Sequence, residues 1–242
     1  MSEPILAAIW DLDGTLLNTE SIYLQVENQT IEKYGGKGDV STVAHKLLGT
    51  PGLDCARVIV DHFCLNTSPE QYLSTRDEVL VDKFTSTQFC EGALELVKLF
   101  ASYGVRQVRQ FKSCHVIESI ATSSGSFLTQ LKLSAHKSIV DAYIDHVICR
   151  EDVTYGKPFP DIFLLAAKKM GMTPKNCVVL EDAPNGVVAA KRAGMRCVGI
   201  RNSLLTSEHY RDADWIVDSL QKWQVEELLK DINRMGHLKL FE

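Results

Sequence analysis

The sequence lacks the features that mark several special classes of protein. No stretch approaches the roughly 18 apolar residues of a membrane span, and no basic segment leads into an apolar one near residue 1. There is also no internal repeat and no low-complexity segment. These absences predict a globular protein without a signal peptide and without a membrane partner.

The chain also lacks a long run of basic residues. Its 26 lysines and arginines are outnumbered by 31 aspartates and glutamates, which gives a formal net charge of -5. Because nucleic-acid binding draws on clustered positive charge, we expect no nucleic-acid partner. A chain of 242 residues, 45% of them apolar, suffices for one domain with a sizeable core, or for a large domain with a small insert.

Cysteine pairs of the C-x-x-C type are absent. An odd number of cysteines at irregular spacing argues against a disulfide framework or a zinc site and for a reducing compartment, so we expect a cytoplasmic protein. Cys149, Cys177 and Cys197 lie in or beside apolar runs and are predicted to be core residues. The seven cysteines are Cys55, Cys64, Cys90, Cys114, Cys149, Cys177 and Cys197.

The most informative motif that is present lies near the N-terminus. The apolar run over residues 5–10 has the length of a buried strand and is followed directly by Asp11-Leu12-Asp13-Gly14-Thr15. Both acids would then lie at the carboxyl edge of a sheet, where open α/β sheets bind their ligands. Carboxylate oxygens suit Mg²⁺, which would offset the two charges. The alternative is a simple strand-end turn, in which Asp and Gly are favoured.

A helical pattern follows this motif and continues to about residue 88. The predicted helices cover residues 19–34, 43–48, 53–63 and 70–84, and glycine or proline breaks separate them. The glycine cluster at 35–38 has no strand before it and lacks the Walker spacing, so it predicts a helix connection and not a phosphate loop. Residues 18–88 are therefore predicted to form a small all-helical unit.

From residue 92 the pattern changes to strands alternating with helices. Apolar runs of strand length end at Ala121 and cover residues 143–149, 177–180, 197–200 and 213–217, with predicted helices at 93–103, 161–170, 184–194 and 224–232. This alternation predicts an α/β fold with a Rossmann-like parallel sheet and helices on both faces. The predicted division is an α/β catalytic core of residues 1–17 and 89–242 and an inserted helical cap of residues 18–88, which would cover the crevice as a lid.

Three further groups of reactive side chains follow predicted strands. Thr122-Ser123-Ser124-Gly125 would offer a hydroxyl and free backbone N–H groups to an anion, or would only cap a helix. Lys157, between a glycine and a proline, could neutralise a phosphate or a carboxylate, or could be an ordinary solvated loop lysine. Glu181 and Asp182 could complete a Mg²⁺ shell with the first two acids, although Asp182 could instead cap the next helix.

These four groups, all at the carboxyl ends of predicted strands, resemble the haloacid dehalogenase superfamily. The motifs that carry the resemblance are DLDGT, ATSS, GKPFPDIF and LEDAPNGVVAAKRAGM. The resemblance covers nearly the whole chain, including a helical cap between the first two motifs. Within the superfamily the motifs look most like small-molecule phosphatases related to pseudouridine-5'-phosphatase and glycerol-phosphate phosphatase.

The resemblance implies a Mg²⁺-dependent phosphatase that hydrolyses a small phosphorylated metabolite, such as pseudouridine 5'-phosphate or a glycerol phosphate. Asp11 would attack phosphorus and form an aspartyl-phosphate. Asp13 would protonate the leaving alkoxide and then deprotonate the hydrolytic water. We expect the enzyme to be a monomer.

The resemblance also implies the residues that bind phosphate and metal. Thr122 and the backbone N–H of Ser123 would hold the phosphoryl oxygens, and Lys157 would offset the charge on them. Four groups would hold Mg²⁺: the side chains of Asp11, Glu181 and Asp182 and the backbone carbonyl of Asp13. Since the cap sets the substrate in enzymes of this type, Glu20, Gly49 and Thr50 are expected near the leaving group. Gly49 could instead only end a helix, and Glu20 could face solvent.

Two other activities of the superfamily are weighed from the residues. Dehalogenases generally lack the second acid, so Asp13 favours phosphate chemistry. Sugar phosphomutases resemble D-x-D-G-x-x-x-D-T-x-x-x-H, whereas this chain has Tyr23 in place of the histidine and Asn18 in place of the third aspartate. Tyrosine does not easily replace histidine near neutral pH, so hydrolysis is favoured and phosphomutase chemistry is an alternative.

One departure from the family lies before the second motif. Gly104 and Thr122 are 18 positions apart, much further than the family generally has them. The additional residues could form a surface loop, could reshape the strand and displace Thr122, or could come from exon choice. Because Glu118 and Ser119 would be poor interior residues of a parallel strand, the first explanation is disfavoured. A catalytically impaired phosphate-binding member is therefore a further alternative.

Overall fold

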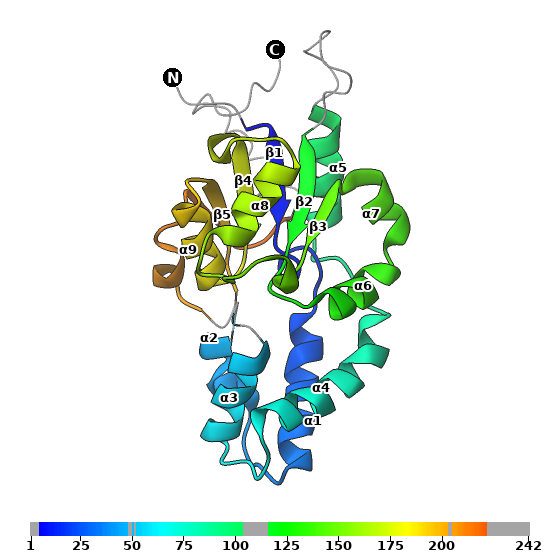
Figure 1. Cartoon of the computed structure of the whole chain (residues 1–242), viewed down its shortest axis with the longest axis vertical. Helices are drawn as coiled ribbons and strands as arrows, with labels where there is room; N and C mark the ends of the chain where they lie inside the picture. Colours follow the sequence, from blue (N-terminus) through cyan, green and yellow to red (C-terminus); the bar gives the residue numbers. More distant parts are fainter. Residues whose placement is uncertain (1–4, 48–49, 51, 104–115, 203–204, 222–242) are drawn as a thin grey trace.

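The computed structural model describes residues 5–47, 50, 52–103, 116–202 and 205–221, and a parallel sheet lies at its centre (Figure 1). The six strands run in the order β3-β2-β1-β4-β5-β6, and every neighbouring pair is parallel. Their bounds are Ala7–Trp10 (β1), Ile117–Ala121 (β2), His146–Ile148 (β3), Cys177–Glu181 (β4), Arg196–Ile200 (β5) and Trp215–Val217 (β6).

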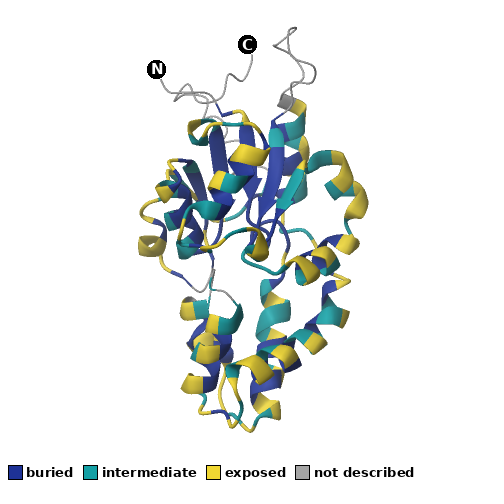
Figure 2. Ribbon diagram, viewed as in Figure 1, coloured by how far each residue is buried: buried dark blue, intermediate teal, exposed yellow. Residues whose placement is uncertain are grey.

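Helices cover both faces of the sheet, which confirms the predicted α/β class. Successive side chains of a strand point to opposite faces, so Trp10 packs with Phe100 of α5 (Ala93–Tyr103), while Ile9 packs with Phe163 of α8 (Asp161–Lys169). The side of α5 also holds α7 (Lys137–Tyr143), and the side of α8 holds α9 (Pro184–Arg192). Burial on both faces explains why the strands read as continuous apolar runs, and Figure 2 shows the central strands in dark blue.

A group of helices lies beyond the carboxyl ends of the strands (Figure 1). It consists of α1 (Glu20–Lys33), α2 (Ala44–Leu47), α3 (Gly52–His62) and α4 (Pro69–Phe84), which bury Ile31, Ile59 and Tyr72 among them. The start of α4 follows the usual pattern, because the Ser68 hydroxyl accepts a hydrogen bond from the N–H of Gln71 and a proline follows. The division into a core of residues 1–17 and 89–242 and a cap of residues 18–88 stays a prediction.

One further α-helix and four 3₁₀ turns complete the helices of the described residues. α6 (Ser126–Ser134) follows β2 and reaches back toward the helical group, where it packs against α4. Single 3₁₀ turns occur at Val40–Thr42, Arg150–Asp152, Pro174–Asn176 and Ser207–Tyr210. In the part of the chain that the structure describes, no helix combines the length and apolar character needed to cross a bilayer.

One predicted strand begins inside a helix, and one predicted helix is outside the described residues. The sequence predicts a strand over residues 143–149, but β3 is only His146–Ile148, because Tyr143 ends α7. Tyr143 and Ile144 pack against the core from the end of a helix. In the sequence, a short apolar run at a helix end looks the same as a buried strand. The predicted helix at 224–232 lies outside the described residues. Cys149, Cys177 and Cys197 are buried, as predicted.

The strand before Thr122 forms in spite of its polar side chains. β2 pairs with β1 from Ile117 to Ile120, and Glu118 and Ser119 are fully buried within it. The expectation that these residues would disfavour an interior strand is therefore wrong. Trp10 Nε1 donates a hydrogen bond to Glu118 Oε2 at 2.7 Å, and burial raises the pKa of Glu118 to about 9, so the side chain is uncharged near pH 7. The additional residues at 104–115 lie outside the described residues.

Glu118→Gln is expected to stabilise the protein at pH 8 and to weaken the dependence of its stability on pH. The folded protein holds a proton on Glu118 up to about pH 9, whereas the unfolded chain releases it near pH 4.5. The stability linked to this proton is complete below the unfolded pKa and is lost as pH rises through the folded one. Glutamine keeps an oxygen for Trp10 and cannot ionise, so we expect a gain on the order of 2–4 kcal/mol at pH 8.

Urea unfolding of both proteins at pH 6, 7 and 8 measures this effect. Glu95→Gln, at an exposed position of α5, is the matched control and should behave as the wild type does. Equal pH slopes for the wild type and Glu118→Gln would show that Glu118 does not carry a buried proton.

Candidate active site

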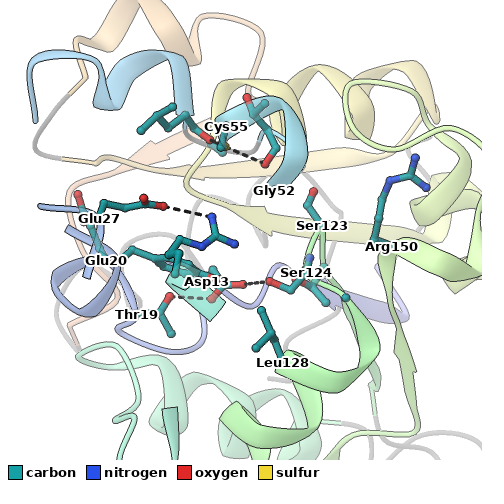
Figure 3. Close-up of a pocket in the computed structure, with 18 of the residues that line it drawn as sticks. Asp13, Thr19, Glu20, Glu27, Gly52, Cys55, Ser123, Ser124, Leu128 and Arg150 are labelled. Carbon is teal, nitrogen blue, oxygen red and sulfur yellow. Dashed lines mark hydrogen bonds and ion pairs between the residues drawn. The ribbon is translucent and has the colours of Figure 1, made fainter. Parts of the chain in front are cut away.

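The predicted site residues meet at the carboxyl ends of β1, β2 and β4, where the sheet faces the helical group. A cavity of about 460 Å³ lies there and is lined by residues of both parts. Figure 3 shows Asp13 and Ser124 on one side of it, with Glu27, Gly52 and Cys55 on the side of the helical group. The predicted site residues that line the cavity are Asp11, Asp13, Thr122, Ser123, Glu181 and Asp182.

The turn after β1 brings a third carboxylate close to the first two. The N–H of Asp11 donates to the carbonyl of Leu180 at 3.0 Å, which extends the pairing with β4. Gly14 has φ +82°, and a side chain there would collide with Asp182. Thr15 Oγ1 donates to Asp182 Oδ1 at 3.1 Å. Gly14 thus leaves space for the Asp182 carboxylate, and Thr15 binds it. A simple strand-end turn would not require either contact.

A buried lysine lies within the resulting cluster of acids. Lys157 is only 4% exposed, and its Nζ donates to Asp11 Oδ1 at 2.5 Å, to Glu181 Oε1 at 2.7 Å and to the carbonyl of Ala121 at 3.0 Å. It lies beneath the cavity wall and is not a solvated loop lysine. Gly186 leaves the space that Glu181 fills, since any side chain at residue 186 would overlap the Glu181 carboxylate.

The acids outnumber the positive charge that is buried with them. Burial raises the pKa of Asp11 to about 7, and the attraction of Lys157 only partly opposes this because Glu181 and Asp13 add negative charge. Burial and the charges of Glu181 and Asp11 also raise the pKa of Asp182. Burial acts to lower the pKa of Lys157, but the two neighbouring carboxylates outweigh it and raise that pKa. Lys157 therefore stays charged while the carboxylates lack counter-charge.

This donor set fits a hard divalent cation. Asp11, Glu181 and Asp182 each place a carboxylate oxygen within 4.8 Å of the other two, and all three residues are buried. Mg²⁺ takes oxygen ligands in a compact octahedron, and its charge would reverse the upward shifts of the carboxylate pKa values. A helix-capping role for Asp182 is not observed, because α9 begins after Ala183 and has no side-chain cap.

The Thr122–Gly125 segment forms the side of the site at the end of β2. Thr122 is buried, and its Oγ1 accepts a hydrogen bond from the N–H of Ser124 at 3.0 Å. No side chain of the Thr122–Gly125 segment caps α6. The N–H of Ser126, the first residue of that helix, donates to the Glu151 carboxylate instead. Thr122 and Ser123 therefore face the cavity without serving as a cap.

Asp13 is turned toward a residue that the sequence analysis missed. Lys132 Nζ donates to Asp13 Oδ1 at 2.6 Å and to Oδ2 at 2.9 Å, while Thr19 and Ser124 donate one further hydrogen bond each (Figure 3). Burial acts to raise the pKa of Asp13, but the charge and hydrogen bond of Lys132, with those two hydroxyls, outweigh it and lower that pKa. The sequence offers only one sign of this role. Lys132 and Leu133 are three and four positions after Thr129, so all three lie on one face of α6, and that face is buried.

A buried ion pair in the helical group borders the far side of the cavity and was also missed. Arg76 Nη1 donates to Glu27 Oε1 at 3.1 Å, and its Nε and Nη2 donate to Asp77 Oδ1. The Tyr72 hydroxyl donates to Glu27 Oε2 at 2.5 Å. Glu20 and Thr50, which were expected near the leaving group, also line the cavity, and Gly49 lies outside the described residues.

The chain matches a family model described as haloacid dehalogenase-like hydrolase over residues 5–194. It belongs to the haloacid dehalogenase-like hydrolase family. The acids after β1, the acids at the end of β4, the threonine after β2 and the buried lysine are the four groups on which the sequence resemblance was based, and the fold brings them together. Their individual roles stay predictions.

Relatives of similar length carry phosphatase names. A Drosophila melanogaster protein named probable pseudouridine-5'-phosphatase is 32% identical over 224 residues, which are 90% of this chain and 91% of the relative. The Arabidopsis thaliana (DL)-glycerol-3-phosphatase 2 is 33% identical over 92% of this chain and 90% of its own length.

Solved structures support the fold alone. The CbbY protein of Rhodobacter sphaeroides, solved in complex with phosphate, superposes with a TM-score of 0.74 at 23% identity over 90% of this chain and 96% of that one. The β-phosphoglucomutase of Clostridium difficile superposes with a TM-score of 0.75 at 20% identity over 96% of this chain and 98% of that one.

Proposed function

We propose that this chain is a Mg²⁺-dependent phosphatase that hydrolyses a small phosphorylated metabolite through an aspartyl-phosphate. The observation that carries the proposal is the buried carboxylate of Asp11, held by Lys157 at the floor of a cavity that holds two further acids. The phosphatase names of the relatives support the same activity.

In this proposal Asp11 is the nucleophile. Lys157 binds its Oδ1, so Oδ2 attacks phosphorus and the ester oxygen leaves. Thr122 and the N–H of Ser123 bind the phosphoryl oxygens, and Lys157 offsets part of their charge. Bound Mg²⁺, held by Asp11, Glu181, Asp182 and the carbonyl of Asp13, would stabilise the negative charge of the transferring group.

Asp13 moves the protons of the two half-reactions. Burial is outweighed by Lys132, which lowers the pKa of Asp13, but the negative charge of a bound phosphate ester favours the protonated form of this carboxyl. Protonated Asp13 gives its proton to the leaving alkoxide, and the resulting carboxylate takes one from the water that hydrolyses the aspartyl-phosphate, which regenerates Asp11 and protonated Asp13 and releases phosphate. Its side chain is 23% exposed and lines the cavity, so it is open to the leaving group and to water.

The charges on the side of the helical group favour an uncharged leaving group. The Arg76 guanidinium already has two carboxylate partners, Glu27 and Asp77, and Glu20 adds a further negative charge on the same side. On that side of the cavity a second phosphate would therefore meet net negative charge, while Arg150, which lines the side of the sheet, donates to the carbonyls of Val153 and Thr154. The remaining lining of the side of the helical group is mostly apolar, apart from Thr50 and the hydroxyl of Tyr23, and about 460 Å³ is enough for a leaving group of nucleoside size. We therefore favour a nucleoside monophosphate, such as pseudouridine 5'-phosphate, over a bisphosphate.

The same charges argue against the phosphomutase alternative. Moving a phosphoryl group between two hydroxyls of one sugar by way of a phosphoenzyme requires the site to hold a sugar bisphosphate. Tyr23, at the position of the phosphomutase histidine, has its hydroxyl bound by Lys132, and burial raises its pKa. The other alternative was a catalytically impaired protein whose additional residues displace Thr122. We do not favour it, because β2 is formed and Thr122 lines the cavity.

Release of inorganic phosphate from a panel of esters, with Mg²⁺ present, tests this proposal. We expect kcat/KM for pseudouridine 5'-phosphate to exceed that for xylulose 1,5-bisphosphate and glucose 1,6-bisphosphate by roughly 10-fold or more, because repulsion of a second phosphate costs about 1.4 kcal/mol or more. Glucose 1-phosphate should yield phosphate and no glucose 6-phosphate. A preference for bisphosphates would contradict the assigned leaving group, and no release from any ester would contradict the phosphatase.

A further inference from the structure

A fully buried lysine holds both carboxylate oxygens of Asp13. Lys132 is 0% exposed, and its ammonium donates to Asp13 Oδ1 and Oδ2, to Ser124 Oγ at 2.8 Å and to the Tyr23 hydroxyl at 3.0 Å. These acceptors satisfy all of its N–H groups. Its position on α6 is far from Asp13 in sequence, so the contact depends on how the whole chain folds.

Packing alone does not explain a lysine at this position. The Nζ of Lys132 lies 4.6 Å from the centre of the Phe84 ring and 5.1 Å from that of Tyr23, and Leu128 and Leu131 of the same helix pack into the same cluster. An apolar side chain of similar length would suit such surroundings. A buried ammonium is costly unless a fixed partner compensates it, and the only carboxylate that it contacts in the described residues is that of Asp13.

The donors to Asp13 come from three different parts of the chain. Thr19 lies just before α1, Ser124 lies between β2 and α6, and Lys132 lies on α6 itself. Ser124 Oγ accepts from Lys132 and donates to Asp13 Oδ2, so the lysine also orients the serine. With Lys132 binding both oxygens, the plane of the carboxylate is fixed.

We infer that Lys132 is a positioning residue of the proposed reaction, which sets the direction in which Asp13 exchanges protons with the leaving group and with water. The inference rests on the proposed function, because it assigns Lys132 a role only through Asp13. Lys157 binds the nucleophile and Lys132 binds the acid–base group, so two buried lysines divide the two carboxylates of the first motif between them.

Two substrates with different leaving groups separate this role from a structural one. An alkyl phosphate needs a proton on its leaving oxygen, whereas p-nitrophenolate leaves without one. For p-nitrophenyl phosphate, kcat/KM covers the steps up to transfer of the phosphoryl group to Asp11, which does not depend on Asp13. Lys132→Met should therefore lower kcat/KM for an alkyl phosphate such as pseudouridine 5'-phosphate by roughly 10²-fold, and that for p-nitrophenyl phosphate by less than about 3-fold.

The controls keep other causes apart. Lys137→Met, at an exposed lysine of α7 that pairs with Asp141, should leave both values at the wild-type level. Asp13→Asn should show the same substrate dependence as Lys132→Met. The thermal midpoint of Lys132→Met is measured alongside, and if that variant does not fold, Lys132→Gln, which keeps a hydrogen-bond donor, replaces it in the comparison.

Each outcome decides the inference. Selective loss with the alkyl phosphate supports it. An equal loss with both substrates, no loss, or a gain in kcat/KM would overturn it while leaving the phosphatase intact, since the wild type would still release phosphate in a Mg²⁺-dependent way. A folded wild type that releases phosphate from neither substrate would overturn both the proposed function and the role of Lys132.

Discussion

Asp11→Asn is expected to lower the rate of phosphate release by about 10⁴-fold or more while the protein stays folded. An amide is a poor nucleophile and cannot form the aspartyl-phosphate. Asparagine has the same shape and keeps an oxygen that accepts from Lys157, and Lys157 also retains Glu181 as a partner. The loss should therefore lie in the chemical step.

Steady-state phosphate release and calorimetric titration with substrate measure the two parts of this expectation. The dissociation constant of Asp11→Asn should stay within about 10-fold of the wild-type KM, since only one oxygen of the site has changed. Asp141→Asn, at an exposed aspartate of α7, is the matched control and should turn over normally. Turnover by Asp11→Asn above about 1% of the wild-type rate would remove Asp11 as the nucleophile.

Removal of divalent cations is expected to stop turnover completely, and Mg²⁺ in excess of the chelator should restore it. Asp11, Glu181 and Asp182 bring three buried carboxylates together with one ammonium, Lys157, so the site lacks positive charge both for its own acids and for an incoming phosphate. Dialysis against chelator, followed by phosphate release with graded Mg²⁺, measures the effect. Full activity in chelator would contradict the site as proposed.

Thermal unfolding gives a readout of the metal that does not depend on activity. Mg²⁺ at ten times its dissociation constant should stabilise the wild type by about 1.4 kcal/mol and raise its thermal midpoint. Asp182→Asn should lose this shift, while Asp212→Asn, at an exposed position, should keep it. A shift of the same size in Asp182→Asn would show that Mg²⁺ binds elsewhere.

The sequence predicts the sheet and the first motif well because both are local signals. The apolar runs at β1, β4 and β5 are continuous, as expected for strands that are buried on both faces. Acids or a hydroxyl that directly follow such runs must lie at one edge of a parallel sheet. This is why Asp11, Thr122 and Asp182 could be placed together before their contacts were known.

The sequence predicts buried polar side chains poorly. Glu118 reads as a charged residue that a central strand should exclude, yet it lies in β2 because Trp10 binds it and burial keeps it protonated. Arg76 and Glu27 read as ordinary surface positions of two helices, yet they pair at 3.1 Å beside the cavity. In each case the compensating partner is distant in sequence, so no local pattern reveals it.

By itself the sequence determined the order of the strands along the chain, the acidic turn after β1 and the identities of the groups that meet at the sheet edge. These follow from periodicity and from short motifs, which depend on neighbouring residues. Only the tertiary structure decided that Lys132 binds Asp13, that Arg76 is already neutralised and that Glu118 is buried. Those contacts join residues 119, 49 and 108 positions apart, and the energy of a buried charge depends on the partner that the fold brings to it.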